Sequence, residues 1–571
     1  MKQTIRIFLA CTLLCSVFGC RSQSSVERPN VIIVMTDDQG YGDLSCHGNP
    51  DIKTPNLDKL HSQSTRFTNF HVDPTCAPTR AALITGRYSI RTGVWHTIAG
   101  RSFLRRDEVT LGDVFKSNGY ATGMFGKWHL GDNYPCRPQD RGFDETINHG
   151  GGGVGQTPDL WGNDYFDDRY WHNGKPQQYE GYCTDVFFGG ALEFIGKNKD
   201  KPFFCYLLPN APHGPYLVPD FYAKPYRDRG IPDNRAKFYG MLSNIDDNMG
   251  LLLAKLDDLG LSENTIVVFM TDNGTAGPWY PKDGEDFSAG LRGIKGSIYE
   301  GGHRVPSFWR WPKGGIKSGV DVPDVAAHID MMPTLVDMCG LKKRGGPELD
   351  GSSLKPLLAG DASSWKERTL IVNNQRIPVP EKYRNFSVMT DRWRLVNKTE
   401  LYDMDADLGQ TKNVADANPD VVKQLMQSYE DWWGGVTRTD EVVPAVVGSN
   451  HENPSILTAH DWHASKIPWH QDVVAEAPLF EGHWIVDIER AGDYEITLRQ
   501  QPTEAKFQIE GDNAQLQVGD VDVSSPIKAG DTSVTFTVSL QKGLTRIQGW
   551  FTKGEKSRGA YYAYVRRLES R

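Results

Sequence analysis

A cysteine in the first part of the chain has the surroundings of a reactive side chain. Cys76 precedes Pro78, which the first turn of a helix tolerates, and Gly86 stands where such a helix would end. The spacing predicts a short helix that opens just after Cys76, so that its sulfur faces unpaired backbone N–H groups that favour anions. Arg80, one turn further on, adds a fixed positive charge to the same face. The alternative for a single cysteine of an exported chain is half of a disulfide or a small buried residue.

Four side chains with oxygen ligands follow two runs of β-branched residues. Asp37 and Asp38 come directly after one run, and Asp272 and Asn273 come directly after another. Carboxylate and amide oxygens without companion histidine or cysteine suit Ca²⁺ or Mg²⁺ and argue against zinc. Taken singly, each aspartate is as well explained as a helix cap or a turn former. Together they predict a cation site at one edge of a sheet.

The sequence around Cys76 is similar to the signature of a known family. Cys76-x-Pro78-x-Arg80 followed by Ala-Ala-Leu-Ile-Thr-Gly-Arg resembles the type I sulfatases, in which the cysteine is oxidised after translation to formylglycine. The resemblance covers most of residues 30–430 and implies a formylglycine-generating maturation enzyme as a partner. It implies one Ca²⁺ ion held by the formylglycine oxygen at position 76 and by four further ligands, Asp37, Asp38, Asp272 and Asn273.

Four cationic or titratable side chains lie in segments that resemble the sulfate-binding and acid–base motifs of this family. A single surface lysine is nearly always solvated, and a single histidine is more often structural than catalytic. A sulfate monoester nevertheless needs such a set, because cations bind its oxygens and an acid protonates the leaving alcohol. The four residues are Lys127, His129, His213 and Lys295.

The resemblance also implies a mechanism. Hydrated formylglycine is a geminal diol, and the metal ion together with Arg80 favours its ionised hydroxyl. That oxygen attacks sulfur while Lys127 and Lys295 hold the sulfate oxygens, and His213 protonates the departing oxygen. The second hydroxyl loses its proton toward His129 and expels sulfate, which restores the aldehyde.

A weaker resemblance concerns the substrate. Gly126–Gly131, Cys136–Pro138 and Arg141–Asp144 are similar to sulfatases that act on galactose or N-acetylgalactosamine 4-sulfate, which implies an exo-acting enzyme on a sulfated saccharide of a host or algal glycan. Two other readings stay open: a phosphohydrolase or phosphonate hydrolase of the same fold, and a catalytically idle glycan-binding lipoprotein. The phosphate enzymes usually use two metals with histidine ligands, whereas Asn273 is not followed by such a run.

The elements that must position these residues alternate between strands and helices. Continuous apolar runs, each followed by polar residues, predict strands at Asn30–Thr36, Tyr120–Phe125, Phe203–Leu208 and Thr265–Thr271. Helical patterns lie between them, at Thr110–Asn118, Asp185–Lys197 and Arg235–Leu259. This order predicts an α/β fold with a mostly parallel sheet sandwiched by helices, whose sites lie at the carboxyl ends of the strands. The resemblance implies an alkaline-phosphatase-like arrangement.

The remaining segments predict a cover for the site and two smaller parts. Asn148–Glu180 has no period and is read as a long loop, either for substrate selection or as a structural excursion. Short strands and a closing helix follow the polar linker Lys342–Pro347, at Phe386–Thr390, Trp393–Val396, Glu400–Asp403 and Pro419–Trp433. After Val442, period-two strands predict an antiparallel β-sandwich, for packing or for glycan binding, with strands in His483–Ile488, Asp493–Leu498 and Thr532–Val538.

These patterns give the expected domain organisation. We expect a signal peptide over residues 1–20, a sulfatase catalytic domain over 28–341, a small α+β C-terminal subdomain over 342–440 and the appended sandwich over 441–571. The 571 residues are 39% hydrophobic and 24% charged, which is ordinary for a globular protein. The formal net charge of -9 gives no general attraction to nucleic acid or anionic lipid, so local basic residues must attract an anionic substrate.

The N-terminus and the cysteines predict an exported protein. Lys2 and Arg6 precede the apolar run Ile7–Phe18, which is too short to span a membrane and has the form of a secretory signal. Gly19-Cys20 resembles a bacterial lipoprotein junction, which implies a lipid anchor at Cys20 and a periplasmic or outer-membrane location; simple secretion is the alternative. Of the nine cysteines, an odd number remains after the signal, the lipid site and Cys76, so at least one thiol is free.

Overall fold

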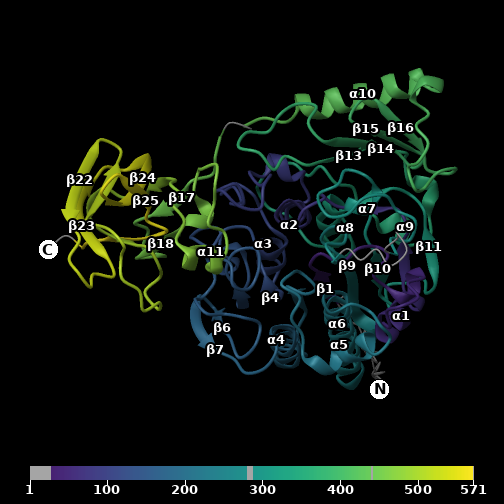
Figure 1. The fold of residues 1–571 in the computed structure, drawn as a ribbon. Helices are drawn as coiled ribbons and strands as arrows, with labels where there is room; N and C mark the ends of the chain where they lie inside the picture. The colour runs from purple at the N-terminus through teal and green to yellow at the C-terminus, as the bar shows by residue number, and fades with distance from the viewer. Residues whose placement is uncertain (1–27, 279–286, 439–440, 570–571) are drawn as a thin grey trace, which may run out of the picture.

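The computed structural model describes residues 28–278, 287–438 and 441–569. The predicted signal peptide and Cys20 lie outside the described residues. Three assemblies of strands follow one another along the chain (Figure 1): a large α/β unit, a small sheet under one long helix, and a C-terminal sandwich. No described helix is both long enough and apolar enough to cross a bilayer.

The α/β unit is built on a ten-stranded mixed sheet. The five central strands are parallel, in the order β9-β1-β8-β4-β5, and antiparallel pairs join β10 and β6 to them on either side. The predicted α/β class is confirmed, with a parallel centre and mixed edges. From one edge to the other the strands are β11 (Val320–Val322), β2 (Thr65–Phe67), β10 (Ser307–Arg310), β9 (Thr265–Thr271), β1 (Asn30–Thr36), β8 (Phe203–Leu208), β4 (Ala121–Lys127), β5 (Glu145–His149), β6 (Arg169–His172) and β7 (Lys175–Gln178).

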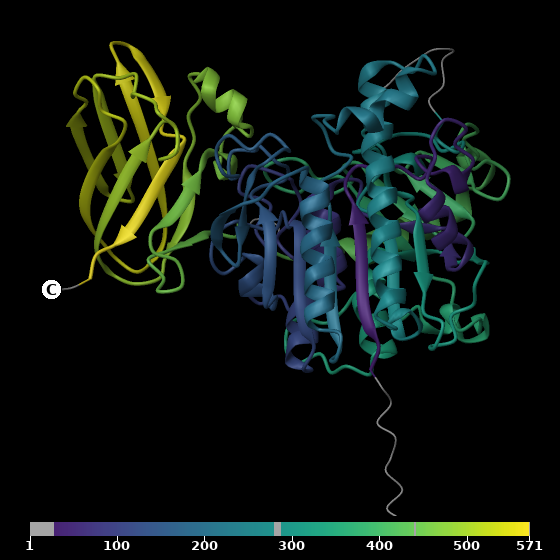
Figure 2. The same cartoon turned by 90° about the horizontal axis from the view of Figure 1, so that it is seen from below.

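Helices cover both faces of this sheet, as Figures 1 and 2 show. Strand β1 explains why, because its side chains alternate between two apolar cores: Val31 and Ile33 enter one, Ile32 and Val34 the other. One face carries α1 (Pro55–Ser62), α4 (Cys183–Lys197), α5 (Asp220–Arg227) and α6 (Asp233–Asp258). The other carries α2 (Cys76–Thr85), α3 (Leu111–Ser117), α8 (Met331–Met338) and α9 (Lys355–Leu358).

The segment predicted as one long loop, Asn148–Glu180, is partly regular. Strands β6 and β7 form an antiparallel hairpin there and extend the large sheet beyond β5. The expectation of an unstructured cover was therefore wrong for residues 169–178. The cause is that β7 is exposed along its whole length, so it lacks the apolar alternation by which a strand is recognised in a sequence.

The small sheet follows the α/β unit. Its four antiparallel strands are β13 (Leu370–Asn373), β14 (Phe386–Met389), β15 (Trp393–Val396) and β16 (Glu400–Asp403), and α10 (Pro419–Gly434) packs against them. The last three strands and the helix confirm the predicted elements, whereas β13 was not predicted.

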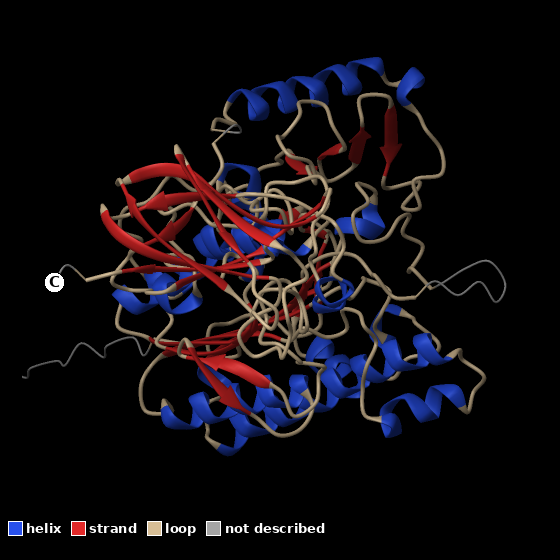
Figure 3. Cartoon of the chain, turned by 60° about the vertical axis from the view of Figure 1, so that its left-hand side comes forward, coloured by secondary structure: helices blue, strands red, loops and turns tan. Residues whose placement is uncertain are grey.

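The C-terminal sandwich has two facing layers of strands (Figure 3). One sheet orders β17 (Ala445–Val447), β19 (Trp484–Ile488), β24 (Gly543–Lys553), β21 (Asn513–Val518) and β22 (Val521–Pro526), with β25 (Lys556–Gly559) on β24. The other orders β18 (Ser455–Thr458), β26 (Tyr562–Arg567), β20 (Gly492–Arg499) and β23 (Val534–Leu540). All pairs are antiparallel except β17 with β19. Phe103 and Cys136 of the α/β unit enter its core, so the two parts pack directly.

Candidate active site

Cys76 is the first residue of helix α2, at the carboxyl edge of the sheet. Thr75 has an extended backbone before it, and Gly86 ends the helix at φ 70°, in the left-handed region that favours glycine. The predicted helix is confirmed and begins one residue earlier than expected. Every residue of α2 is buried, and Cys76 is 3% exposed. The six described cysteines are all free, so Cys76 is not in a disulfide with any of them.

The four predicted oxygen ligands meet at the ends of β1 and β9. These strands are parallel neighbours in which Thr36 pairs with Thr271, so the residues after them lie side by side. The Asp38 backbone N–H donates to Asp272 Oδ1 at 3.1 Å, and the Asn273 amide donates to Asp38 Oδ1 at 2.9 Å. Asp38 has φ 66°, a left-handed conformation that is strained for a non-glycine residue.

Three cationic side chains from distant parts of the chain contact these carboxylates. Lys127, the last residue of β4, donates to Asp37 Oδ2 at 2.7 Å. Lys295 donates to Asp38 Oδ2 at 2.7 Å. The Arg80 guanidinium donates to Asp272 Oδ2 at 2.7 and 3.1 Å. The structure therefore brings together residues that lie more than 200 positions apart in the chain.

Glycine at position 126 is needed to bring Lys127 to this edge. Its φ is 110°, and a Cβ there would lie 2.0 Å from the Leu208 carbonyl oxygen of β8. Because backbone cannot move aside cheaply, only glycine lets β4 lie this close to β8 just before the lysine.

The two predicted histidines lie beside the cluster, and their hydrogen bonds show which ring nitrogen carries the hydrogen. Nδ1 of His213 is 2.7 Å from the Gly214 carbonyl, and Nε2 of His129 is 2.8 Å from the Thr97 carbonyl. A carbonyl only accepts, so these two nitrogens carry the hydrogens. Nε2 of His213 lies 3.6 Å from Asp38 Oδ2, whereas His129 Nδ1 is buried without a partner. His213 therefore faces the carboxylates, and His129 offers an unshared lone pair.

Burial and neighbouring charges shift the pKa values of the two adjacent aspartates in opposite directions. Burial raises the pKa of Asp37 to about 8, although Lys127 works against this. Burial acts on Asp38 in the same direction, but Lys295, followed by His213, holds its pKa below the usual range. The ionised form of Asp37 is thus poorly stabilised by protein groups alone.

The carboxylate cluster fits a divalent cation. Asp37 Oδ1 and Asn273 Oδ1 are both buried and accept no hydrogen bond from any described group. The Cys76 sulfur and carboxylate oxygens of Asp37 and Asp272 all lie within 4.8 Å of one another. Orphaned buried acceptors of this kind are rare unless a missing donor or cation completes them. The donor set is rich in hard oxygens, as Ca²⁺ and Mg²⁺ require.

A second buried cluster, His71, Glu300 and His303, is not a comparable metal site. Arg304 donates to Glu300 Oε2 at 2.5 Å and Arg394 donates to Oε1 at 2.6 Å, so the carboxylate is already shared by two cations. This network instead fixes the segment after Lys295 against the strand before Cys76, because the Val72 N–H donates to the His303 carbonyl at 2.9 Å.

Two residues near the site were not predicted. Asn210 is fully buried two residues after β8, beside the Tyr165 hydroxyl, which donates to the His213 carbonyl at 3.3 Å. The strand-end rule used for β1 and β9 would have found Asn210. His460 comes from the C-terminal sandwich, with its ring centroid 6.4 Å from that of His129, and no local pattern signals such a contact.

Comparisons with known proteins agree with this geometry. Residues 29–341 match the family described as Sulfatase, and residues 294–432 match the one described as N-sulphoglucosamine sulphohydrolase, C-terminal. The chain is 31% identical over 467 residues to arylsulfatase A of Homo sapiens, covering 70% of this chain and 86% of that one. It is 32% identical over 367 residues to N-acetylgalactosamine-6-sulfatase of Rattus norvegicus, covering 60% and 68%. A solved structure of Ps i-CgsB in complex with k-i-k-neocarrahexaose is similar with a TM-score of 0.63 and 29% identity, covering 71% and 93%.

Proposed function

Because the chain belongs to the sulfatase family and is a sulfuric ester hydrolase, we propose that it hydrolyses a sulfated saccharide with residue 76 as a formylglycine nucleophile. One observation carries the proposal: Cys76, at a helix N-terminus, lies within 4.8 Å of the ligand atoms of Asp37 and Asp272. Neither aspartate explains a cysteine here as a structural residue. Both suit an oxygen nucleophile held beside a cation.

The modification changes what residue 76 can do. A separate maturation enzyme must supply a two-electron oxidant, either dioxygen or a redox cofactor of its own, that takes two hydrogens from the –CH₂SH group. Water then replaces the sulfur, which leaves as hydrogen sulfide, and the product is an aldehyde. Hydrated formylglycine supplies two hydroxyls on one carbon: one attacks sulfur, and the other expels sulfate and restores the aldehyde.

Ca²⁺ is the cation we propose for the cluster. Asp37, Asp38, Asp272 and Asn273 would hold it, since their oxygens are hard donors and two of those oxygens are unsatisfied. When bound, the ion supplies positive charge that favours an ionised hydroxyl at residue 76.

The lysines and histidines then have separate tasks. Lys127 and Lys295 donate to Asp37 and Asp38, and once these carboxylates hold a cation both ammonium groups would be available to bind sulfate oxygens. The Nε2 atom of His213, at the open side of the cluster, protonates the leaving oxygen. Burial lowers the pKa of His213 to about 4, so the negative charge of the bound ester must favour its protonation.

His129 is the base for the second step. Burial, with Lys127 next, lowers its pKa well below the usual value, which keeps the ring neutral. Since Nε2 donates to Thr97, the unpartnered Nδ1 accepts the proton of the second hydroxyl.

The substrate we propose is galactose or N-acetylgalactosamine 4-sulfate at the end of a glycan. The support is the sequence pattern from Gly126 to Asp144, and the relatives named arylsulfatase A and N-acetylgalactosamine-6-sulfatase act on the same bond class. A panel of defined saccharides sulfated at O4 or O6, with sulfate release as the readout, decides the position. Higher turnover of the 6-sulfates would overturn the 4-sulfate assignment.

Mass spectrometry of the peptide that spans Cys76 tests the nucleophile. In the native host we expect the mass loss that corresponds to replacing –CH₂SH by –CHO, and Cys76→Ala should abolish sulfate release without lowering the melting temperature. An unmodified cysteine in an active protein would contradict the proposal. Export with a lipid anchor at Cys20 is a separate proposal, supported by the N-terminal pattern and tested by loss of fatty-acid labelling in Cys20→Ser.

A further inference from the structure

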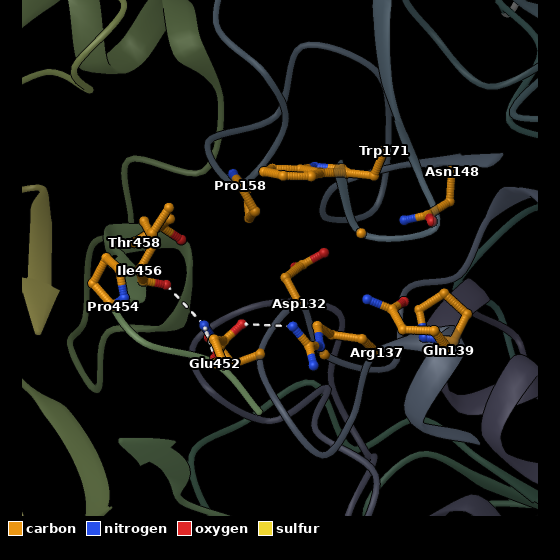
Figure 4. Close-up of a pocket in the computed structure, with 14 residues that line it drawn as sticks. Asp132, Arg137, Gln139, Asn148, Pro158, Trp171, Glu452, Pro454, Ile456 and Thr458 are labelled. Carbon is orange, nitrogen blue, oxygen red and sulfur yellow. Dashed lines mark hydrogen bonds and ion pairs between the residues drawn. The ribbon is translucent and has the colours of Figure 1, made fainter. Parts of the chain in front are cut away.

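A cavity of about 220 Å³ lies between the α/β unit and the C-terminal sandwich (Figure 4). The cavity is partly open to solvent, and its volume is enough for one small ring. The loop after β4 and the hairpin β6–β7 line one side, and the segment around β18 lines the other. Its lining thus includes the part of the chain that was expected to be a plain loop.

One wall of the pocket is the indole of Trp171, from β6. Figure 4 shows the ring plane extended across the pocket, with the carboxylate of Asp132 pointing toward it from the opposite wall. Pro158 and Pro454 add apolar surface at one end. An aromatic face opposite polar groups suits a ligand with one apolar face and polar edges.

Several polar atoms of the pocket have no partner in the protein. Asn148 and Thr458 are each 7% exposed, and both Asn148 Oδ1 and Thr458 Oγ1 are buried without a hydrogen bond. Because buried polar atoms are nearly always paired, these two oxygens point to a donor that the described residues do not supply, either a ligand hydroxyl or a water molecule.

The charges of the pocket disfavour an anionic ligand. Its single guanidinium, Arg137, is held by Asp140 at 2.7 and 3.0 Å and by Glu452 at 3.4 Å. Asp132 accepts from the Gly151 N–H at 3.0 Å, which leaves its second oxygen for a donor. Burial raises the pKa of Asp132 to about 7, so this carboxyl carries only part of a negative charge near neutral pH. Because the one guanidinium of the lining is already paired, the pocket offers no free cation to a sulfate and presents hydrogen-bonding groups to neutral hydroxyls.

The pocket shares a wall with the candidate active site. Asp132 follows His129 by three residues, and its partner Gly151 is adjacent to Gly152, where a Cβ would lie 2.4 Å from the His129 ring. Asn148 pairs with Gly126 in the β4–β5 ladder, next to Lys127. The segment from His129 to Asp132 therefore joins the two sites.

We propose that this interdomain pocket binds one unsulfated sugar unit of the glycan. The inference rests on the proposed function for its choice of a saccharide. The ring stacks on Trp171, and its hydroxyls bond to Asp132, Asn148 and Thr458. The C-terminal sandwich is then part of substrate recognition, since Thr458 and Glu452 belong to it.

Titration calorimetry with a neutral galactose disaccharide tests the proposal. The full chain should bind it, and Trp171→Ala should weaken binding by about tenfold or more, because the stacked face is lost. Asn148→Ala should weaken binding as well. Trp469→Ala is the matched control: it removes a 42% exposed tryptophan of the adjoining segment that does not line the pocket, and binding should be unchanged.

The possible outcomes separate this inference from the proposed function. Equal binding by the full chain and Trp171→Ala, or no binding by the full chain, would each overturn the pocket assignment. Melting temperatures check folding, and Trp171→Phe, which keeps a ring, should retain most of the binding if Trp171→Ala unfolds. Sulfate release from nitrophenyl sulfate by the unaltered chain tests the chemistry alone, so a failure there leaves the binding result valid.

Discussion

Replacing Arg80 should destabilise the α/β unit far more than replacing a similar surface arginine. Arg80 is 1% exposed, its guanidinium donates twice to Asp272, and Nη1 donates to the Lys127 carbonyl at 2.7 Å. In Arg80→Met, the Asp38 N–H is the only donor to the Asp272 carboxylate that remains among the described residues. Removing one partner of a buried ion pair costs about 3–5 kcal/mol.

This cost can be converted into a melting temperature. The α/β unit and the small sheet together have about 400 residues, with an unfolding entropy of ~2.1 cal/mol/K per residue. A loss of ~4 kcal/mol in the free energy of unfolding then lowers the melting temperature by about 5 °C. Arg80→Lys keeps the charge but not the forked geometry, so its shift should lie between those of the methionine variant and the unaltered chain. Since Asp272 is a proposed calcium ligand, added calcium should restore part of the loss.

Scanning calorimetry of the full chain measures these shifts, and Arg392→Met is the control. Arg392 also donates two hydrogen bonds to an aspartate, at 2.9 and 2.6 Å to Asp403. Its side chain is 54% exposed, so its removal should change the melting temperature little. If Arg80→Met melts no lower than Arg392→Met, burial does not determine how much the Arg80–Asp272 ion pair stabilises the fold, and the reasoning is refuted.

Three further predictions concern the site and the buried Glu300 network next to it. His213→Ala should slow hydrolysis of alkyl sulfates by about 10²–10⁴-fold and of nitrophenyl sulfate far less, since only a poor leaving group needs a proton; equal losses would exclude the acid role. Chelation by EGTA should lower both activity and melting temperature, with calcium restoring them, because Asp37 Oδ1 and Asn273 Oδ1 lack donors; an unchanged melting temperature would argue against the cation. Burial opposes ionisation of Glu300, yet Arg304 and Arg394 hold its pKa well below the ordinary 4.5. The ionised Glu300 therefore contributes its full stabilisation above pH 4.5, and this contribution is lost as the pH falls from 4.5 through the lowered pKa of the folded state. In Glu300→Gln, the melting temperature should depend less on pH in this acidic range.

The part of the site that follows strand ends could be predicted from the sequence. Asp38 and Asp272 come after apolar runs long enough to mark buried parallel strands, and parallel neighbours end at the same edge. The helix at Cys76 was predictable because Pro78 and Gly86 constrain its two ends locally. In each case the information lies within a few residues of the feature.

The part that could not be predicted depends on contacts between distant segments. His460 reaches the neighbourhood of His129 because the sandwich packs on the α/β unit, and nothing near either histidine in the sequence encodes that contact. Strand β7 was missed because its exposed residues carry no alternation. Sequence periodicity reports burial, so elements and contacts that do not depend on an apolar face remain invisible to it.

The way the sandwich is attached indicates that it does more than fill space. Gln471 donates through its side-chain amide to three carbonyls, of Gln156, Asp159 and Leu160, at 3.2–3.3 Å, and its backbone N–H donates to Gly155 at 3.0 Å. These partners lie in the segment that also contributes Pro158 to the pocket. A polar anchor of this kind fixes position and orientation, whereas apolar packing alone tolerates sliding. The sandwich therefore holds the 150–160 segment in place beside His129, and displacing it should disturb saccharide binding before it disturbs the carboxylate cluster.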